Sequence, residues 1–129
     1  MSFKFYIPAL MWTLVILIII AIPGNYIPKP HGVWELISPD KILHFGMFAP
    51  LSFFIAWGIF KDQKTRVTAI IISLAFGIIY AIATELLQYF VVTGRNGNIY
   101  DAIADVIGVI LGLLLFHKII KNKSIKNPI

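Results

Sequence analysis

The hydrophobic positions of this chain gather in four long blocks with short polar segments between them. The blocks cover approximately residues 5–22, 41–60, 67–92 and 99–120. Each block has about the 20 residues that cross a bilayer as a helix, and the third is long enough that it would tilt or project beyond the lipid. The pattern therefore predicts four transmembrane helices.

A soluble four-helix bundle is the main alternative to a membrane protein, and the pattern argues against it. A helix on the surface of a soluble bundle keeps one polar face, whereas the stretch LVILIIIAI at residues 14–22 is apolar on every face. The chain is 59% hydrophobic and 13% charged, about half the charged fraction usual for a soluble domain. We therefore expect an all-α, polytopic membrane protein with residues 1–129 as a single domain. The first block is expected to be an uncleaved anchor rather than a signal peptide, because the following AIPGN is a poor cleavage site.

The basic residues are unevenly divided between the two sides of a four-span arrangement. Of the 11 Lys and Arg residues, three fall on one side: Lys29, Lys41 and Arg95. The others fall on the opposite side, in the N-terminal tail, in the segment KDQKTR and in the C-terminal tail. The positive-inside rule then places both termini in the cytoplasm. The basic C-terminal tail is a topology signal and does not indicate a nucleic-acid partner.

Ionisable residues inside the blocks are rare, and they concentrate near the outer surface. The third and fourth blocks should form a hairpin around Arg95, with Glu85 about ten residues before the turn and Asp105 about ten after it. At about 1.5 Å per residue, these two carboxylates reach similar depth. Gln88 shares a helical face with Glu85, and Asp101 shares one with Asp105.

A charge at this depth costs at least about 2.5 kcal/mol, and such residues almost always face a bundle interior or a wet cavity. We therefore expect an outward-facing polar pocket walled by the last three blocks. Its expected lining is Asp40, Lys41, His44, Glu85, Gln88, Arg95, Asp101 and Asp105. Gly108 and Gly112 continue the acidic face as a GxxxG pair, which would let a neighbouring helix approach closely, either within one chain or between two copies.

The chemistry of such a pocket stays open at the level of sequence. Glu85 and His44 are candidates for an acid and a base. Lys41 and Arg95 are candidates for holding a phosphate or carboxylate, with the acids and Gln88 contacting amines, hydroxyls or amides. His44, Glu85 and Asp105 are suitable metal ligands, but a metal site is not favoured, because the cluster has a single histidine and no paired-ligand spacing. No cofactor is expected, and with no cysteine the chain has no thiolate ligand. In a purely structural alternative the groups only satisfy one another, through pairs such as Arg95 with Asp101.

The polar residues also carry a resemblance to a known family. The segments DKILHFGMF, ELLQ, a following Arg and DAIADVIGVILG resemble, in that order, the signature of the VanZ-like small bacterial membrane proteins, over about residues 39–115. The signature positions fall on Asp40, Lys41, His44, Phe45, Glu85, Gln88, Arg95, Asp101, Gly108 and Gly112. One position departs, because the family often has Asn where this chain has Asp105. A second carboxylate is then not essential, which favours a hydrogen-bonding Glu85 over a paired-carboxylate or metal mechanism.

The resemblance implies a role at the cell envelope. The family is named for a member associated with resistance to teicoplanin, a glycopeptide antibiotic with a lipid tail. We therefore expect a membrane protein that binds or acts on a membrane lipid or a lipid-linked cell-envelope molecule. The alternatives are an enzyme acting on a lipid-linked substrate through Glu85 and His44, and a structural subunit of a membrane complex.

Overall fold

The computed structural model describes residues 2–26, 39–62, 65–95 and 97–126, apart from the side chains of residues 39–40 and 123–126. Nearly all of these residues are helical, and the described part of the chain contains no strand. The predicted all-α class is therefore confirmed. In chain order the elements are η1 (Phe3–Phe5), α1 (Ile7–Ile20), η2 (Gly24–Tyr26), α2 (Pro39–Lys61), α3 (Arg66–Phe90) and α4 (Ile99–Lys126).

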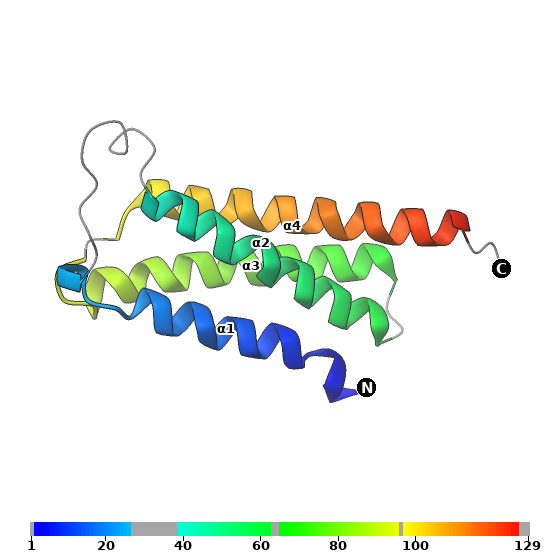
Figure 1. The fold of residues 1–129 in the computed structure, drawn as a ribbon, viewed down its shortest axis with the longest axis horizontal. Coiled ribbons are helices and arrows are strands. Elements are labelled where there is room, and N and C mark those ends of the chain that lie inside the picture. The colour runs from blue at the N-terminus through cyan, green and yellow to red at the C-terminus, as the bar shows by residue number, and fades with distance from the viewer. Residues whose placement is uncertain (1, 27–38, 63–64, 96, 127–129) are drawn as a thin grey trace.

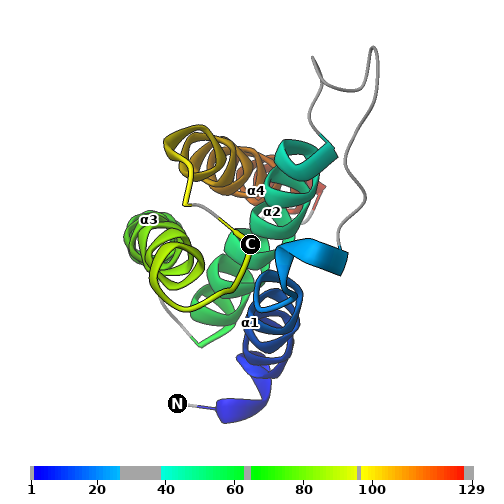
Figure 2. The same cartoon turned by 90° about the vertical axis from the view of Figure 1, so that its left-hand side faces the viewer.

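The four α-helices run lengthwise in one bundle, and α2 crosses it diagonally (Figure 1). Seen end-on, α2 lies between α1 on one side and the α3–α4 pair on the other (Figure 2). Helix α2 makes its largest contact with α4 and also packs on α3 and α1. Both η1 and the end of α4 lie at one end of the bundle, whereas residues 21–26, 91–95 and 97–98 lie at the other, which we call the loop end (Figure 1).

Three helices are long and apolar enough to cross a membrane: Lys41–Lys61, Arg66–Phe90 and Ile99–Asn122. Helix α1 has 14 residues, which is about 21 Å of rise and less than the roughly 30 Å of a bilayer core. The apolar block at residues 5–22 is thus not one continuous α-helix. Its start forms η1 and its end turns at Ala21, shortly before Pro23.

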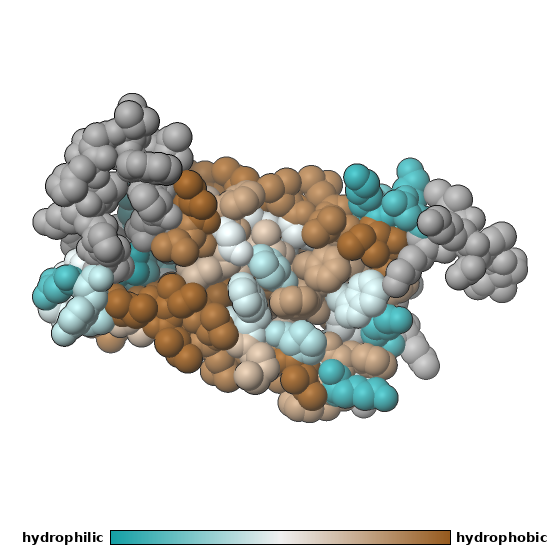
Figure 3. All heavy atoms as spheres, viewed as in Figure 1, coloured by the Kyte–Doolittle hydropathy of each residue, from teal (hydrophilic) through white to brown (hydrophobic). Residues whose placement is uncertain are grey.

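The surface between the two ends of the bundle is apolar, as a multi-pass membrane protein requires. Large side chains such as Ile18, Ile79 and Leu114 are more than half exposed. Hydrophilic residues gather at the two ends, with a predominantly hydrophobic band between them (Figure 3). In water this exposed band would be unfavourable, whereas acyl chains would cover it without cost.

Small residues bring α2 and α4 together. A Cβ added at Gly108 would lie 2.5 Å from the Phe45 carbonyl oxygen, and one at Gly112 would overlap the Ala49 carbonyl oxygen. The Ser52 hydroxyl donates to the Val109 carbonyl oxygen at 2.9 Å across the same contact. Gly108 and Gly112 therefore allow close packing of α2 on α4 within one chain, which is one of the two interpretations of the GxxxG pair. Association between two copies stays a prediction.

Helix α1 is held against α2 near Pro50, which lies inside α2. Proline lacks an N–H and disturbs the helix turn that precedes it. The Trp12 indole Nε1 donates to the carbonyl oxygen of Met47 in that turn at 2.7 Å. This hydrogen bond joins the side chain of α1 to the backbone of α2 in the turn before Pro50.

Candidate functional site

Five polar side chains from three helices meet near the loop end, and all five are buried. We call them the polar cluster: His44 from α2, Glu85 and Gln88 from α3, and Asp101 and Asp105 from α4. The exposed fraction is largest for Glu85, at 9%, and is zero for Asp105. All five were predicted site residues.

His44 is the centre of this cluster. Its Nδ1 lies 3.0 Å from Asp105 Oδ1, within hydrogen-bonding distance, and 3.8 Å from Glu85 Oε1. One ligand-type atom from each of the three residues lies within 4.8 Å of the other two. The prediction that Glu85 and Asp105 reach the same depth in a helical hairpin is confirmed, because one imidazole nitrogen faces both carboxylates.

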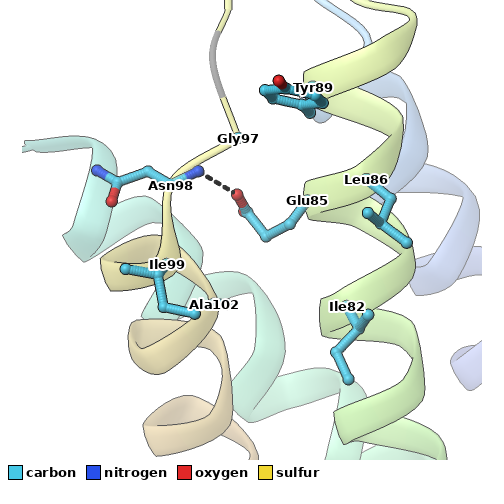
Figure 4. A pocket seen from close by; sticks show the side chains of 8 residues that line it. All are labelled: Ile82, Glu85, Leu86, Tyr89, Gly97, Asn98, Ile99 and Ala102. Atoms are coloured by element: carbon cyan, nitrogen blue, oxygen red, sulfur yellow. Dashed lines mark hydrogen bonds between the residues drawn. The ribbon is translucent and has the colours of Figure 1, made fainter.

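Glu85 also has a contact that the sequence prediction missed. Its Oε2 accepts a hydrogen bond from the backbone N–H of Asn98 at 2.8 Å, immediately before α4 begins (Figure 4). A helix N-terminus carries partial positive charge and unpaired N–H groups, so a carboxylate there is stabilised. Asn98 in turn accepts from the Tyr100 N–H through its side-chain Oδ1 at 3.0 Å. Asn98 before an apolar run, with an acid three residues later, was a recognisable helix-start signal.

The predicted cationic residues are placed at the edge of the cluster. Lys41 Nζ lies 3.6 Å from Asp101 Oδ1, and the lysine side chain is 42% exposed. Asp101 therefore has Lys41 as an ion-pair partner, and its expected pairing with Arg95 stays a prediction. Arg95 is half-buried in the connection between α3 and α4, with its side chain beside Gly24. Asp40 belongs to the first turn of α2, but its side chain lies outside the described residues.

Within the described residues, four polar atoms of the cluster are buried without a hydrogen-bond partner. They are Glu85 Oε1, Gln88 Nε2, Asp101 Oδ1 and Asp105 Oδ2. Buried polar groups in folded proteins almost always have a partner, and leaving one without costs about 1–3 kcal/mol. The structural alternative, in which the groups only satisfy one another, accounts for Asp101 Oδ1 through Lys41 and for Glu85 Oε1 through His44. It leaves Gln88 Nε2 and Asp105 Oδ2 without a partner among the described residues.

A cavity of about 270 Å³ opens between α3 and α4 beside the cluster. Its lining is Ile82, Glu85, Leu86, Tyr89, Gly97, Asn98, Ile99 and Ala102. We call it the α3–α4 groove. Figure 4 shows Glu85 reaching from α3 towards Asn98, with apolar side chains above and below it. Glu85 is the predicted site residue that belongs to this lining; the remaining predicted residues are not part of it.

Comparisons with known proteins agree with the resemblance seen in the sequence. A comparison with protein-family models matches residues 3–121 to the family described as VanZ/LLP1. Neither a search of curated proteins nor a search of solved structures returns a match. The family match extends from η1 through α4 and includes every residue of the polar cluster. The chain belongs to the VanZ/LLP1 family.

Proposed function

We propose first that all four α-helices cross the membrane, with both termini in the cytoplasm and the loop end outside. The N-terminal segment and the end of α4 lie at the same end of the bundle, as an even number of spans requires (Figure 1). The excess of Lys and Arg at that end supports a cytoplasmic position for it. Helix α1 is short, but apolar residues on both sides of it extend the hydrophobic length.

This topology is tested by labelling single cysteines in intact cells, since the chain has no cysteine of its own. Asn98→Cys lies at the loop end and Asn122→Cys lies near the opposite end of α4. We expect a membrane-impermeant maleimide to label position 98 and to reach position 122 only after the cells are opened. Labelling of position 122 alone in intact cells would reverse the topology.

We propose that the loop-end site binds, or acts on, a membrane lipid or a lipid-linked cell-envelope molecule. The observation that carries the proposal is the position of Glu85, a buried carboxylate with one oxygen lacking a partner, in the wall of the α3–α4 groove. The groove is lined mainly by apolar side chains, and Ile82 and Leu86 are more than half exposed. A molecule that places an acyl chain in the groove brings its polar part to Glu85.

The surroundings suggest how such a molecule would be held. Amines, hydroxyls and amides are the groups that a carboxylate and a glutamine side chain can bind, which suits Glu85 and Gln88. Lys41, partly exposed at the edge of the cluster, is placed to contact an anionic headgroup, and Arg95 is a second candidate. In this proposal Asp101 positions Lys41, and His44 with Asp105 forms the buried support of Glu85.

Family membership links the chain in a general way to glycopeptide resistance. We propose that this chain contributes to resistance to glycopeptides of the teicoplanin type by engaging a lipidated molecule at the outer surface. A susceptible host that expresses the chain is expected to tolerate more teicoplanin than one that expresses Glu85→Gln at the same abundance. Equal susceptibility of the two strains and an empty-vector strain would remove the link to resistance.

Lipid contact is tested by photo-crosslinking in native membranes. A benzoylphenylalanine at Leu86 lies in the groove, and one at Ile103 lies on an exposed face of α4 outside it. We expect the adducts at position 86, identified by mass spectrometry, to be enriched in one lipid class relative to those at position 103. Glu85→Gln should abolish that enrichment. The same lipid distribution at both positions would contradict a selective site.

An enzyme is the second candidate, and the His44–Asp105 contact is the observation that favours it. A carboxylate that holds an imidazole in one orientation is a common support for acid–base chemistry. Turnover of a lipid-linked substrate that is lost in His44→Gln, while the crosslinking pattern at Leu86 is retained, would establish catalysis. Loss of both together would favour binding without chemistry.

A further inference from the structure

The polar cluster contains three ligand-type side chains that the fold brings to one point from three helices. His44 Nδ1, a Glu85 carboxylate oxygen and an Asp105 carboxylate oxygen lie within 4.8 Å of one another. The residues are 41 and 20 positions apart in the sequence, so the short ligand spacings typical of metal motifs are absent. We propose that His44, Glu85 and Asp105 together bind one divalent transition-metal ion.

The hydrogen bonds of the two carboxylates leave one oxygen of each available to an ion. Glu85 uses Oε2 for the Asn98 N–H, and its Oε1 faces His44 without a hydrogen-bond partner among the described residues. Asp105 uses Oδ1 for His44, and its buried Oδ2 likewise has no partner in the described part of the chain. The Asp105 side chain is fully buried, and that of Glu85 is 11% exposed. Glu85 Oε1 and Asp105 Oδ1 lie in the same small region as the imidazole nitrogen, and an ion bound there would replace the hydrogen bond between His44 and Asp105 Oδ1.

The distances suit a metal centre after small side-chain movements. Nitrogen and oxygen ligands of Zn²⁺ lie about 2.0–2.2 Å from the metal, which in a tetrahedral site places neighbouring ligand atoms about 3.3–3.6 Å apart. The His44 Nδ1 distances of 3.0 Å to Asp105 and 3.8 Å to Glu85 are close to this range. Rotation of a carboxylate changes such distances by a few tenths of an ångström without moving a helix.

The charge of the cluster also matches a divalent cation. Two ionised carboxylates inside an apolar bundle are costly unless a cation balances them. Asp101 has Lys41 as its cation at 3.6 Å, whereas the basic group between Glu85 and Asp105 is His44. A metal ligand must be a neutral imidazole, so the histidine then contributes no charge. Two carboxylates and one divalent ion give a neutral unit.

The donor set indicates the class of ion. One imidazole with two carboxylates suits Zn²⁺, Fe²⁺ or Mn²⁺ better than Ca²⁺ or Mg²⁺, which prefer all-oxygen sites. Three protein ligands leave at least one coordination position for water or for an oxygen of another molecule. Glu85 lies in both the cluster and the α3–α4 groove, so an ion in this site would lie beside the groove.

Direct metal binding tests the inference with the purified full chain in detergent, without any lipid ligand. After removal of trace metal, we expect calorimetry and elemental analysis to give one equivalent of Zn²⁺. Asp105→Asn keeps the size and one hydrogen-bonding oxygen of Asp105 but removes its charge, and it should weaken Zn²⁺ affinity by at least about tenfold. Asp62→Asn, at the opposite end of the bundle, is the matched control and should bind as the wild type does.

A variant that loses metal binding can do so simply because it misfolds. A variant that gains a spectroscopic signal on binding metal avoids this ambiguity. In His44→Cys, a thiolate takes the position of the imidazole, and Co²⁺ should produce a thiolate-to-cobalt charge-transfer band in the near ultraviolet. His117→Cys on α4 is the control and should give no such band. Absence of stoichiometric Zn²⁺ in the wild type, equal affinity in Asp105→Asn, or an equal band in both cysteine variants would each overturn the site. Such a result leaves the crosslinking test at Leu86 unaffected.

Discussion

Replacing Glu85 by Gln or by Ala separates the charge of this residue from its shape and hydrogen bond. Glu85 Oε2 accepts from the Asn98 N–H at 2.8 Å. A glutamine can place its carbonyl oxygen at the same point, whereas an alanine leaves the N–H without this acceptor. The two variants therefore share the loss of charge and differ in whether the start of α4 keeps its partner.

The expected magnitudes follow from these contacts. Changing a charge-assisted hydrogen bond to a neutral one at a helix N-terminus costs about 1–2 kcal/mol. Removing an ionised group from an apolar span returns a free energy of similar size, about 2.5 kcal/mol. Glu85→Gln should then stay within about 1 kcal/mol of the wild type. Glu85→Ala should be less stable by about 2–4 kcal/mol, since it adds an unpaired N–H and a cavity.

The assay is equilibrium unfolding by SDS in mixed micelles, followed by tryptophan fluorescence, with lipid crosslinking at Leu86 measured on the same variants. We expect Glu85→Gln to fold like the wild type and to lose the lipid enrichment. If Glu85→Gln were destabilised as much as Glu85→Ala, the charge itself would be structural, and the assignment of Glu85 to a binding role would fail. An unchanged Glu85→Ala would show that the contact with Asn98 contributes nothing.

Three further predictions concern stability in the same unfolding assay. Gly112→Ala should destabilise the bundle by about 1–3 kcal/mol because the added methyl group meets the backbone of α2. Gly46→Ala is the control and should be neutral or slightly stabilising, because nothing lies within 4 Å of the added Cβ. Equal effects of the two changes would refute the close contact of α4 with α2 at Gly112. Trp12→Phe should cost about 0.5–1.5 kcal/mol by removing the hydrogen bond to the Met47 carbonyl oxygen, and a neutral result would mean that this bond contributes nothing to stability. Lys41→Met breaks a partly exposed ion pair with Asp101 and should change stability by less than about 1 kcal/mol. A larger loss would contradict the partial exposure of this ion pair.

The sequence predicted the helices more completely than it predicted the contacts within the site. The long apolar blocks identified α2, α3 and α4, because a helix that is apolar on all faces has no stable place in water. The block at residues 5–22 was expected to be a full-length span, and α1 is only 14 residues long. Proline and glycine after the block end the helix early, and hydropathy averaged over a window does not register this.

The partners within the polar cluster could not be predicted from residue depth. The contact of Glu85 with the Asn98 backbone depends on where α4 starts relative to α3, and the pairing of Lys41 with Asp101 depends on the side of α4 that α2 covers. The second is set by the position of α2, which the glycines at 108 and 112 allow to approach α4. The sequence pattern of one helix does not say how the neighbouring helix is rotated about its own axis.

The sequence by itself determined that this chain forms apolar helices with a few ionisable residues near one end, since burial in lipid leaves so few other arrangements for such residues. Only the tertiary structure decided that His44 faces both Glu85 and Asp105, that one Glu85 oxygen caps α4, and that a groove reaches the same carboxylate. The physical reason is that each helix follows from local hydropathy, whereas the meeting of side chains from three helices depends on packing distances of a few ångströms.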